Sequence, residues 1–130
     1  MKTHIFPIRV YYEDTDMAGI VYYANYLRYI ERARSDWVRT LGIDQNRMRE
    51  RDGVVFAVRR VEADYLMPAK FDDELEVRTV TRAVTGARLV MGQEVWRGAT
   101  RLFQAEVTIV CLGESGHPAR LPANIRLLLH

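Results

Sequence analysis

Residues 12–25, with the sequence YEDTDMAGIVYYAN, hold the densest group of side chains that could do chemistry. Two carboxylates, Asp14 and Asp16, stand before a stretch with helical periodicity. The first amides of a helix lack intrahelical partners and carry a partial positive charge, so they can stabilise an oxyanion on a substrate carbonyl. A carboxylate beside them can act as a general base or a nucleophile, and Gly19 would let the backbone approach a ligand closely. The segment therefore suits acyl transfer without a serine or cysteine nucleophile.

Two other interpretations of the same residues involve no catalysis. Asp and Asn before a helix are usually caps or turn formers, and the spacing alone favours that interpretation. The pattern DxDxxG from Asp14 to Gly19 also matches the first half of an EF-hand calcium loop. However, Ala18 and Asn25 occupy loop positions where Asp or Asn and a bidentate Glu are expected, and no helix is predicted before the loop. The calcium interpretation is therefore excluded.

The remaining reactive residue types are few and scattered. The single cysteine, Cys111, lies on the apolar face of a predicted strand and is expected to be a buried small side chain rather than a nucleophile. One cysteine excludes an intrachain disulfide and any multi-cysteine zinc site. His4, His117 and His130 show no ligand spacing. We therefore expect neither a metal nor another cofactor.

Composition restricts the class of protein further. The 130 residues contain 19 Lys and Arg and 17 Asp and Glu, a net charge of +2, so nucleic-acid binding is not expected. A hydrophobic fraction of 48% is typical of a globular chain, and the length predicts one domain over residues 1–130. No apolar run reaches the roughly 18–20 residues of a membrane span, and the beginning of the sequence resembles no secretory signal. We expect a soluble cytoplasmic protein.

One amphipathic helix of about 16 residues is predicted within residues 22–42. Gly42 is expected to cap its carboxyl end, because glycine enters the left-handed conformation without a steric clash. An apolar stripe at helical spacing should face the core. It consists of Tyr26, Leu27, Ile30, Ala33, Trp37, Val38 and Leu41.

Five strands are predicted around this helix, at residues 8–12, 54–65, 74–84, 88–96 and 102–112. Period-2 alternation with short glycine turns favours antiparallel pairing with one buried face. Residues 44–53 are expected to be a polar connector, and residues 113–130 a tail. The sequence thus predicts an α+β fold in which one antiparallel sheet covers one helix. Its exposed edge strands predict a homo-oligomer.

Residues 11–34 (YYEDTDMAGIVYYANYLRYIERAR) resemble the signature of the 4-hydroxybenzoyl-CoA thioesterase family of hotdog-fold proteins. Within that family they are most similar to the acyl-CoA thioesterases encoded with the bacterial Tol–Pal system. Residues 64–77 (DYLMPAKFDDELEV) resemble the same subgroup, and the similarity extends from about residue 9 to about residue 112. The resemblance implies a sheet wrapped around one long central helix. It also implies homodimers joined edge to edge, often assembled into homotetramers, with active sites at the subunit interface.

The resemblance also implies roles for single residues. Asp16 matches the catalytic carboxylate, acting as nucleophile or general base, and Gly19 matches the glycine of the motif. Tyr23 matches the residue whose backbone N–H polarises the thioester carbonyl; some relatives carry His there, so a side-chain role does not carry over. Asp14 is expected to be structural. The motif positions expected to bind substrate or shape the helix entry are Val21, Tyr22, Asn25 and Tyr26.

The implied activity is hydrolysis of short- or medium-chain or aromatic acyl-CoA to the free acid and coenzyme A. Coenzyme A would be part of the substrate, and no cofactor would be needed. Two alternatives stay open: a thioesterase acting on acyl carrier protein, and a non-catalytic hotdog module that binds an acyl ligand or a partner. A hotdog dehydratase would need a catalytic histidine between strand and helix, which this sequence lacks.

Overall fold

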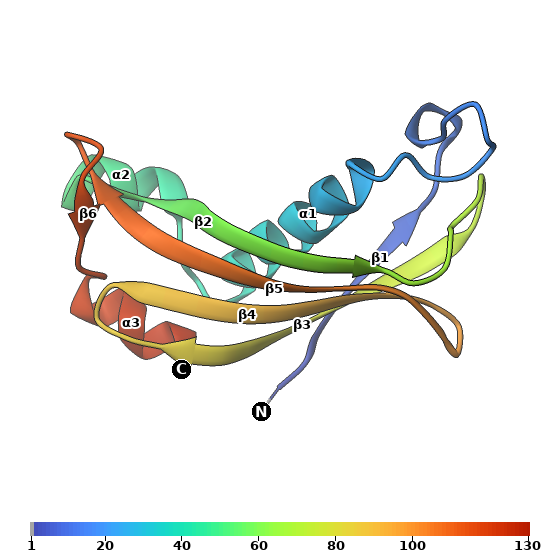
Figure 1. Ribbon diagram of the computed structural model, residues 1–130. Coiled ribbons are helices and arrows are strands. Elements are labelled where there is room, and N and C mark those ends of the chain that lie inside the picture. Colours follow the sequence, from blue (N-terminus) through green and yellow to red (C-terminus); the bar gives the residue numbers. More distant parts are fainter. Residues whose placement is uncertain (1) are drawn as a thin grey trace.

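The computed structural model describes residues 2–130 as a curved antiparallel sheet wrapped around one long helix (Figure 1). The strands are β1 (His4–Arg9), β2 (Val54–Tyr65), β3 (Glu74–Val84), β4 (Arg88–Arg97), β5 (Thr100–Gly113) and β6 (Pro118–Ala119). The helices are α1 (Asn25–Thr40), α2 (Gln45–Asp52) and α3 (Ala123–Leu129). The strand order is β1-β3-β4-β5-β2, and the short β6 pairs with the end of β5. The predicted α+β hotdog arrangement is confirmed.

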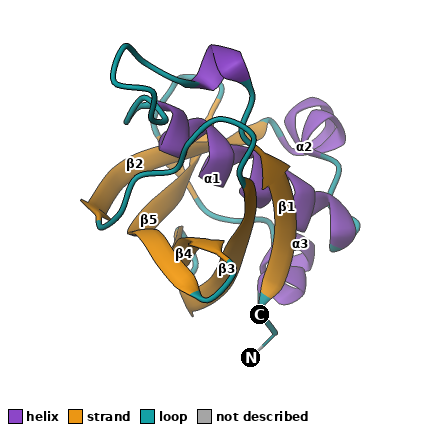
Figure 2. Cartoon of the chain, turned by 90° about the vertical axis from the view of Figure 1, so that its right-hand side faces the viewer, coloured by secondary structure: helices purple, strands orange, loops and turns teal. Residues whose placement is uncertain are grey.

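Helix α1 lies in the hollow of the sheet, between β2 and β1 (Figure 2). Its 16 residues match the predicted length, and Gly42, with φ +85°, adopts the left-handed conformation expected just beyond its end. The prediction that Leu27 faces the core is wrong, since Leu27 is 40% exposed and Tyr29 is buried instead. Successive residues of a helix are turned by about 100°, and Leu27 falls at the margin of the stripe.

The core forms between α1 and the inward-facing residues of the sheet. Alternate positions of β3, β4 and β5 are buried, as period-2 alternation predicts. The predicted inner face of the last long strand is confirmed, because all five of its members are buried. They are Phe103, Ala105, Val107, Ile109 and Cys111.

Two helices lie where the sequence predicts irregular chain. The expected connector 44–53 contains α2, which begins where the Asp44 carboxylate accepts the Arg47 N–H at 3.1 Å and ends at Gly53, with φ +66°. Only Met48 of α2 is buried, so this helix has almost no apolar periodicity. The tail contains α3, whose seven residues are too few to establish a pattern. Only the capping residues could have indicated α2.

The first strand also differs from the prediction of residues 8–12. β1 covers His4–Arg9, and Tyr12–Asp14 form a turn of 3-10 helix in which the Thr15 N–H donates to the Tyr12 carbonyl at 3.1 Å. Pro7 lies within β1, and an edge strand tolerates proline because one side of it needs no hydrogen-bond donors.

Strand β2 is the other edge of the sheet. Its twelve residues pair with β5 on one side only, with a register shift between Val58 and Arg60. Val58, Val61 and Tyr65 on this edge are all more than a third exposed. Such an edge presents unpaired backbone groups to a further strand. No helix within residues 2–130 combines the length and the apolar character needed to cross a bilayer.

Candidate active site

The loop that carries Asp16 folds back on itself just before α1. The Asp16 N–H donates to the Ile20 carbonyl at 2.9 Å, and the Gly19 N–H donates to the Asp16 carbonyl at 3.0 Å. Gly19 has φ +78°, a conformation that side chains disfavour. One oxygen of the Asp16 carboxylate, Oδ1, accepts the Ala18 N–H at 2.9 Å. The other oxygen accepts no hydrogen bond from residues 2–130, so the exposed carboxylate is oriented and has one free oxygen.

The entry to α1 is held by Asp14. The Asp14 carbonyl accepts both the Tyr22 N–H at 2.9 Å and the Asn25 side-chain amide at 2.8 Å. The Asn25 N–H in turn donates to the Tyr22 carbonyl at 2.8 Å. Within residues 2–130, the N–H groups of Tyr23 and Ala24 donate to no protein atom, and no side chain caps the helix. The positive end of α1 is therefore open to an oxygen from outside the chain.

An open groove of about 700 Å³ joins these two features. Asp16, Tyr22 and Asn25 line it, together with the backbone position Ala24. The structure therefore brings Asp16 into one groove with two of the residues that the sequence assigns to substrate binding. Gly19 and Tyr23 lie close in sequence to residues that line the groove, but they do not line it themselves.

The other two assigned residues, Val21 and Tyr26, do not line the groove, and each is only 3% exposed. The Val21 N–H donates to the Ala69 carbonyl at 2.8 Å, and the Tyr26 hydroxyl accepts the Ala69 N–H at 3.0 Å. The Tyr26 ring stacks on Phe103 with the ring centroids 5.1 Å apart. Both residues therefore shape the helix entry from within the chain.

Asp14 supports the loop and lines no part of the groove. Its carboxylate accepts the Tyr11 N–H at 2.8 Å, while its carbonyl holds the helix entry. Buried Tyr29 lies close by, and burial, followed by the Asp14 carboxylate, raises the pKa of the Tyr29 phenol. These contacts agree with the structural role predicted for Asp14.

The loop between β2 and β3 supplies supports that the sequence does not reveal. Ala69 bonds to Val21 and Tyr26, and Lys70 forms an isolated bridge with Ile20. The Asp73 carboxylate fixes this loop by accepting the Lys70 N–H at 2.9 Å and the Arg97 guanidinium at 2.8 Å. Burial raises the pKa of Asp73, but these two hydrogen bonds outweigh it, so the pKa lies below its usual range. Backbone groups make most of these supporting contacts. In the sequence, only the second family-like block, residues 64–77, indicates them.

The other reactive side chains lie outside this site. Cys111 is fully buried, and burial raises the pKa of its thiol to about 11, so it is protonated and inaccessible at neutral pH. The ring of His4 pairs with Asp36 at 2.9 Å, further along α1. No group of three His, Cys, Asp or Glu side chains within residues 2–130 is placed to hold a metal ion.

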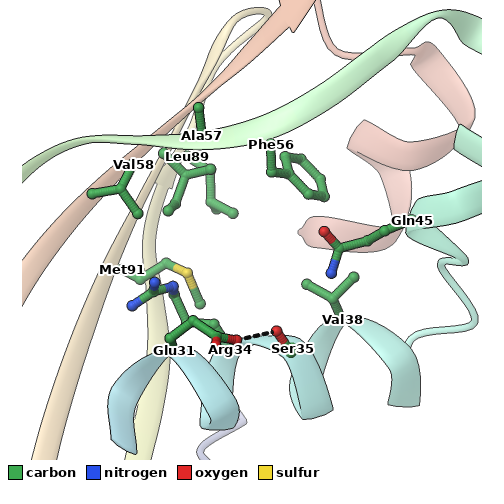
Figure 3. A pocket seen from close by; sticks show the side chains of 11 residues that line it. Glu31, Arg34, Ser35, Val38, Gln45, Phe56, Ala57, Val58, Leu89 and Met91 are labelled. Carbon is green, nitrogen blue, oxygen red and sulfur yellow. Dashed lines mark hydrogen bonds between the residues drawn. The ribbon is translucent and has the colours of Figure 1, made fainter. Parts of the chain in front are cut away.

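A second cavity, of about 230 Å³, lies between α1 and the sheet (Figure 3). Val38, Phe56 and Met91 give it apolar walls, and it opens beside the edge strand β2. Arg34 lines it from α1, and burial lowers the pKa of this guanidinium. The guanidinium donates to the Gln93 side-chain carbonyl at 3.0 Å. The amide of fully buried Gln93 donates to the Ile30 carbonyl at 2.9 Å and to the Thr79 hydroxyl at 3.0 Å.

The chain is similar in sequence to proteins named as acyl-CoA thioesterases. The chain is 39% identical over 127 residues to the acyl-CoA thioesterase YbgC of Haemophilus influenzae, covering 96% of this chain and 93% of the relative. It is 41% identical over 130 residues to the acyl-CoA thioester hydrolase YbgC of Escherichia coli O6:H1, covering 96% of each.

Solved structures show the same fold. A probable thioesterase from Bartonella henselae, 37% identical, superposes with a TM-score of 0.89 over 93% of this chain and 100% of the other. A 4-hydroxybenzoyl CoA thioesterase superposes with a TM-score of 0.91 over the full length of both chains, and its 21% identity supports the fold alone. The sequence profile of the thioesterase superfamily matches residues 18–104, which include the helix entry and most of the sheet. The chain therefore belongs to the thioesterase superfamily, as its family-like motifs predict.

Proposed function

We propose that this protein hydrolyses acyl-CoA thioesters, with Asp16 as the catalytic carboxylate. One observation carries the proposal: the Asp16 carboxylate, with one free oxygen, shares a groove with the open amino end of α1. The relatives of about 40% identity are acyl-CoA thioesterases by name, which supports the same substrate class.

Thioester hydrolysis needs only a carboxylate and an N–H donor for the oxyanion. Asp16 either attacks the thioester carbonyl, forming an anhydride that water hydrolyses, or takes a proton from the attacking water. The Tyr23 N–H stabilises the negative charge that develops on the carbonyl oxygen. Collapse of this oxyanion breaks the C–S bond and gives the anhydride in the first route or the free acid in the second, and the coenzyme A thiolate leaves and takes up a proton. Tyr22 and Asn25 contact the substrate in the groove, while Val21 and Tyr26 hold the helix entry in place.

A second copy of the chain completes the site in this proposal. The end of β2 at Tyr65 contacts the helix entry, and Phe56, Ala57 and Val58 near the start of β2 line the cavity. If β2 pairs antiparallel with its own copy, the Tyr65 end of one strand runs next to the start of the other. The cavity of one subunit then faces the Asp16 groove of the next. The acyl group enters that cavity, and two such dimers can associate into a tetramer.

The dimer is tested by sedimentation at micromolar concentration. We expect the wild type to sediment as a dimer or tetramer, and Val61→Lys to dissociate it, because the charge would be placed on the pairing edge. Leu127→Lys, on the exposed side of α3, is the matched control and should leave the assembly unchanged. A monomeric wild type contradicts the proposed interface.

The substrate class is tested by thiol release from a panel of acyl-CoA esters, from acetyl to palmitoyl, with benzoyl and 4-hydroxybenzoyl. We expect short- and medium-chain or aromatic esters to turn over fastest, because the cavity is small and its sheet side is apolar. Fast turnover of acyl carrier protein esters with poor turnover of CoA esters would change the assigned substrate. No turnover of either class, with ligand still bound, would make the protein a binding module.

A further inference from the structure

Tyr65, the last residue of β2, reaches the helix entry from the far end of the sheet edge. Its hydroxyl donates to the Tyr23 carbonyl oxygen at 3.0 Å. The ring of Tyr65 packs edge-on against buried Tyr26 and buried Phe103, with centroids 5.4 Å and 5.0 Å apart. These contacts restrict the ring, so the hydroxyl is presented in one position. Burial raises the pKa of Tyr65, and the hydroxyl therefore keeps its proton at neutral pH.

The accepting carbonyl belongs to the peptide group at the mouth of the groove. The Tyr23 carbonyl and the Ala24 N–H are parts of one planar trans peptide, so they point in opposite directions. Ala24 lines the groove with Asp16, and its N–H donates to no protein atom of residues 2–130. The same carbonyl also accepts the Tyr26 N–H, at a longer distance of 3.3 Å. The hydrogen bond from the Tyr65 phenol is therefore the shorter of the two. A donor on the carbonyl also polarises the peptide and strengthens its N–H as a donor.

We propose that Tyr65 is a positioning residue for thioester hydrolysis, whose phenol fixes the Tyr23–Ala24 peptide and thereby aims the Ala24 N–H at the substrate carbonyl, next to the Tyr23 N–H. The inference rests on the proposed function, because it assigns Tyr65 a task only if these N–H groups meet an oxyanion. Tyr65 itself touches neither substrate nor reacting atoms. It acts from the strand end, 42 residues further along the chain than Tyr23.

The test is Tyr65→Phe, which keeps the packed ring and removes only the hydroxyl. We expect kcat to fall about tenfold and KM to change less than about twofold. The loss is smaller than the ~10²–10³-fold fall in kcat that removal of a whole oxyanion donor causes, because the N–H stays in place and only its alignment is weakened. Tyr11→Phe is the matched control, because Tyr11 is 62% exposed and does not line the groove. Wild-type kcat in Tyr65→Phe overturns the inference.

A spectroscopic measurement distinguishes orientation of the N–H groups by Tyr65 from a purely structural role of its side chain. In an Asp16→Asn background, which binds ester without turning it over, the carbonyl stretch of bound benzoyl-CoA reports polarisation by the N–H groups. We expect a shift to lower frequency that shrinks when Tyr65→Phe is added and persists when Tyr11→Phe is added. An unchanged shift in Asp16→Asn/Tyr65→Phe assigns the phenol a purely structural role and overturns the inference. Failure of the proposed function is distinguishable, because the wild type would then show no Asp16-dependent turnover at all.

Discussion

Asp16→Asn is expected to lose thioester hydrolysis by ~10²–10⁴-fold while the fold and assembly stay intact. Asparagine keeps the size of the side chain, and its Oδ1 can still accept the Ala18 N–H that now orients the carboxylate. What disappears is the free anionic oxygen, which is the only part able to attack a carbonyl or to accept a proton from water. The exposed position means that removal of the charge leaves the core untouched.

The measurement is thiol release from the best ester of the panel, with thermal unfolding recorded on the same preparations. Asp52→Asn, on the exposed surface of α2, is the matched control and should retain full activity. Unimpaired turnover by Asp16→Asn would remove Asp16 from the mechanism and, with it, the proposed function. A variant that no longer folds would show a lowered unfolding temperature, which separates loss of chemistry from loss of structure.

Tyr23→Pro is expected to lower kcat by ~10²–10³-fold, whereas Tyr23→Ala should stay within a few-fold of the wild type. Proline removes the N–H that the mechanism assigns to the oxyanion, and alanine keeps it. The Asn25 N–H bonds to the Tyr22 carbonyl, so Tyr23 is the second residue of that turn, a place where proline is favoured. The Tyr23 N–H has no partner within residues 2–130, so the fold loses no hydrogen bond.

Steady-state kinetics on both variants decide between backbone and side-chain roles. Alanine removes the same ring contacts with Tyr22 and Tyr65 that proline removes, so it serves as the control for packing. Equal losses in Tyr23→Ala and Tyr23→Pro would assign the effect to the side chain and contradict the N–H role. Far-UV circular dichroism should show the same helix content in both.

Most of the fold follows from periodicity in the sequence. Strand β3 begins and ends where alternation predicts, and α1 has the predicted length, because each buries one continuous apolar face. Strand β2 also has the predicted bounds, although Val54 is its one buried residue. Periodicity does not predict helix α2, since Met48 is its only buried side chain and only the caps at Asp44 and Gly53 mark its ends.

The site is less accessible to prediction than the fold. The structure brings three motif residues, Asp16, Tyr22 and Asn25, into one groove, but the motif does not show that Tyr26 and Val21 are buried. Their burial depends on Ala69, whose backbone groups bond to both across a gap of more than 40 residues. Ala69 acts through backbone groups, which every residue type has, so the sequence does not identify it. The phenol of Tyr65 donates to a backbone carbonyl, and only the structure shows that partner.

The buried amide of Gln93 has a consequence for the alignment of α1 along the sheet. It bonds at once to a helix carbonyl, to a strand hydroxyl and to the guanidinium of Arg34, and no water reaches it. A helix held by apolar contacts alone can slide or roll with little penalty, whereas displacement here would leave polar atoms unpaired at about 1–3 kcal/mol each. Gln93 therefore fixes the position of α1 relative to strands β3 and β4. It fixes how far the amino end of α1 extends along the sheet, through a bond to the Ile30 carbonyl that lies five residues beyond Asn25 of the groove.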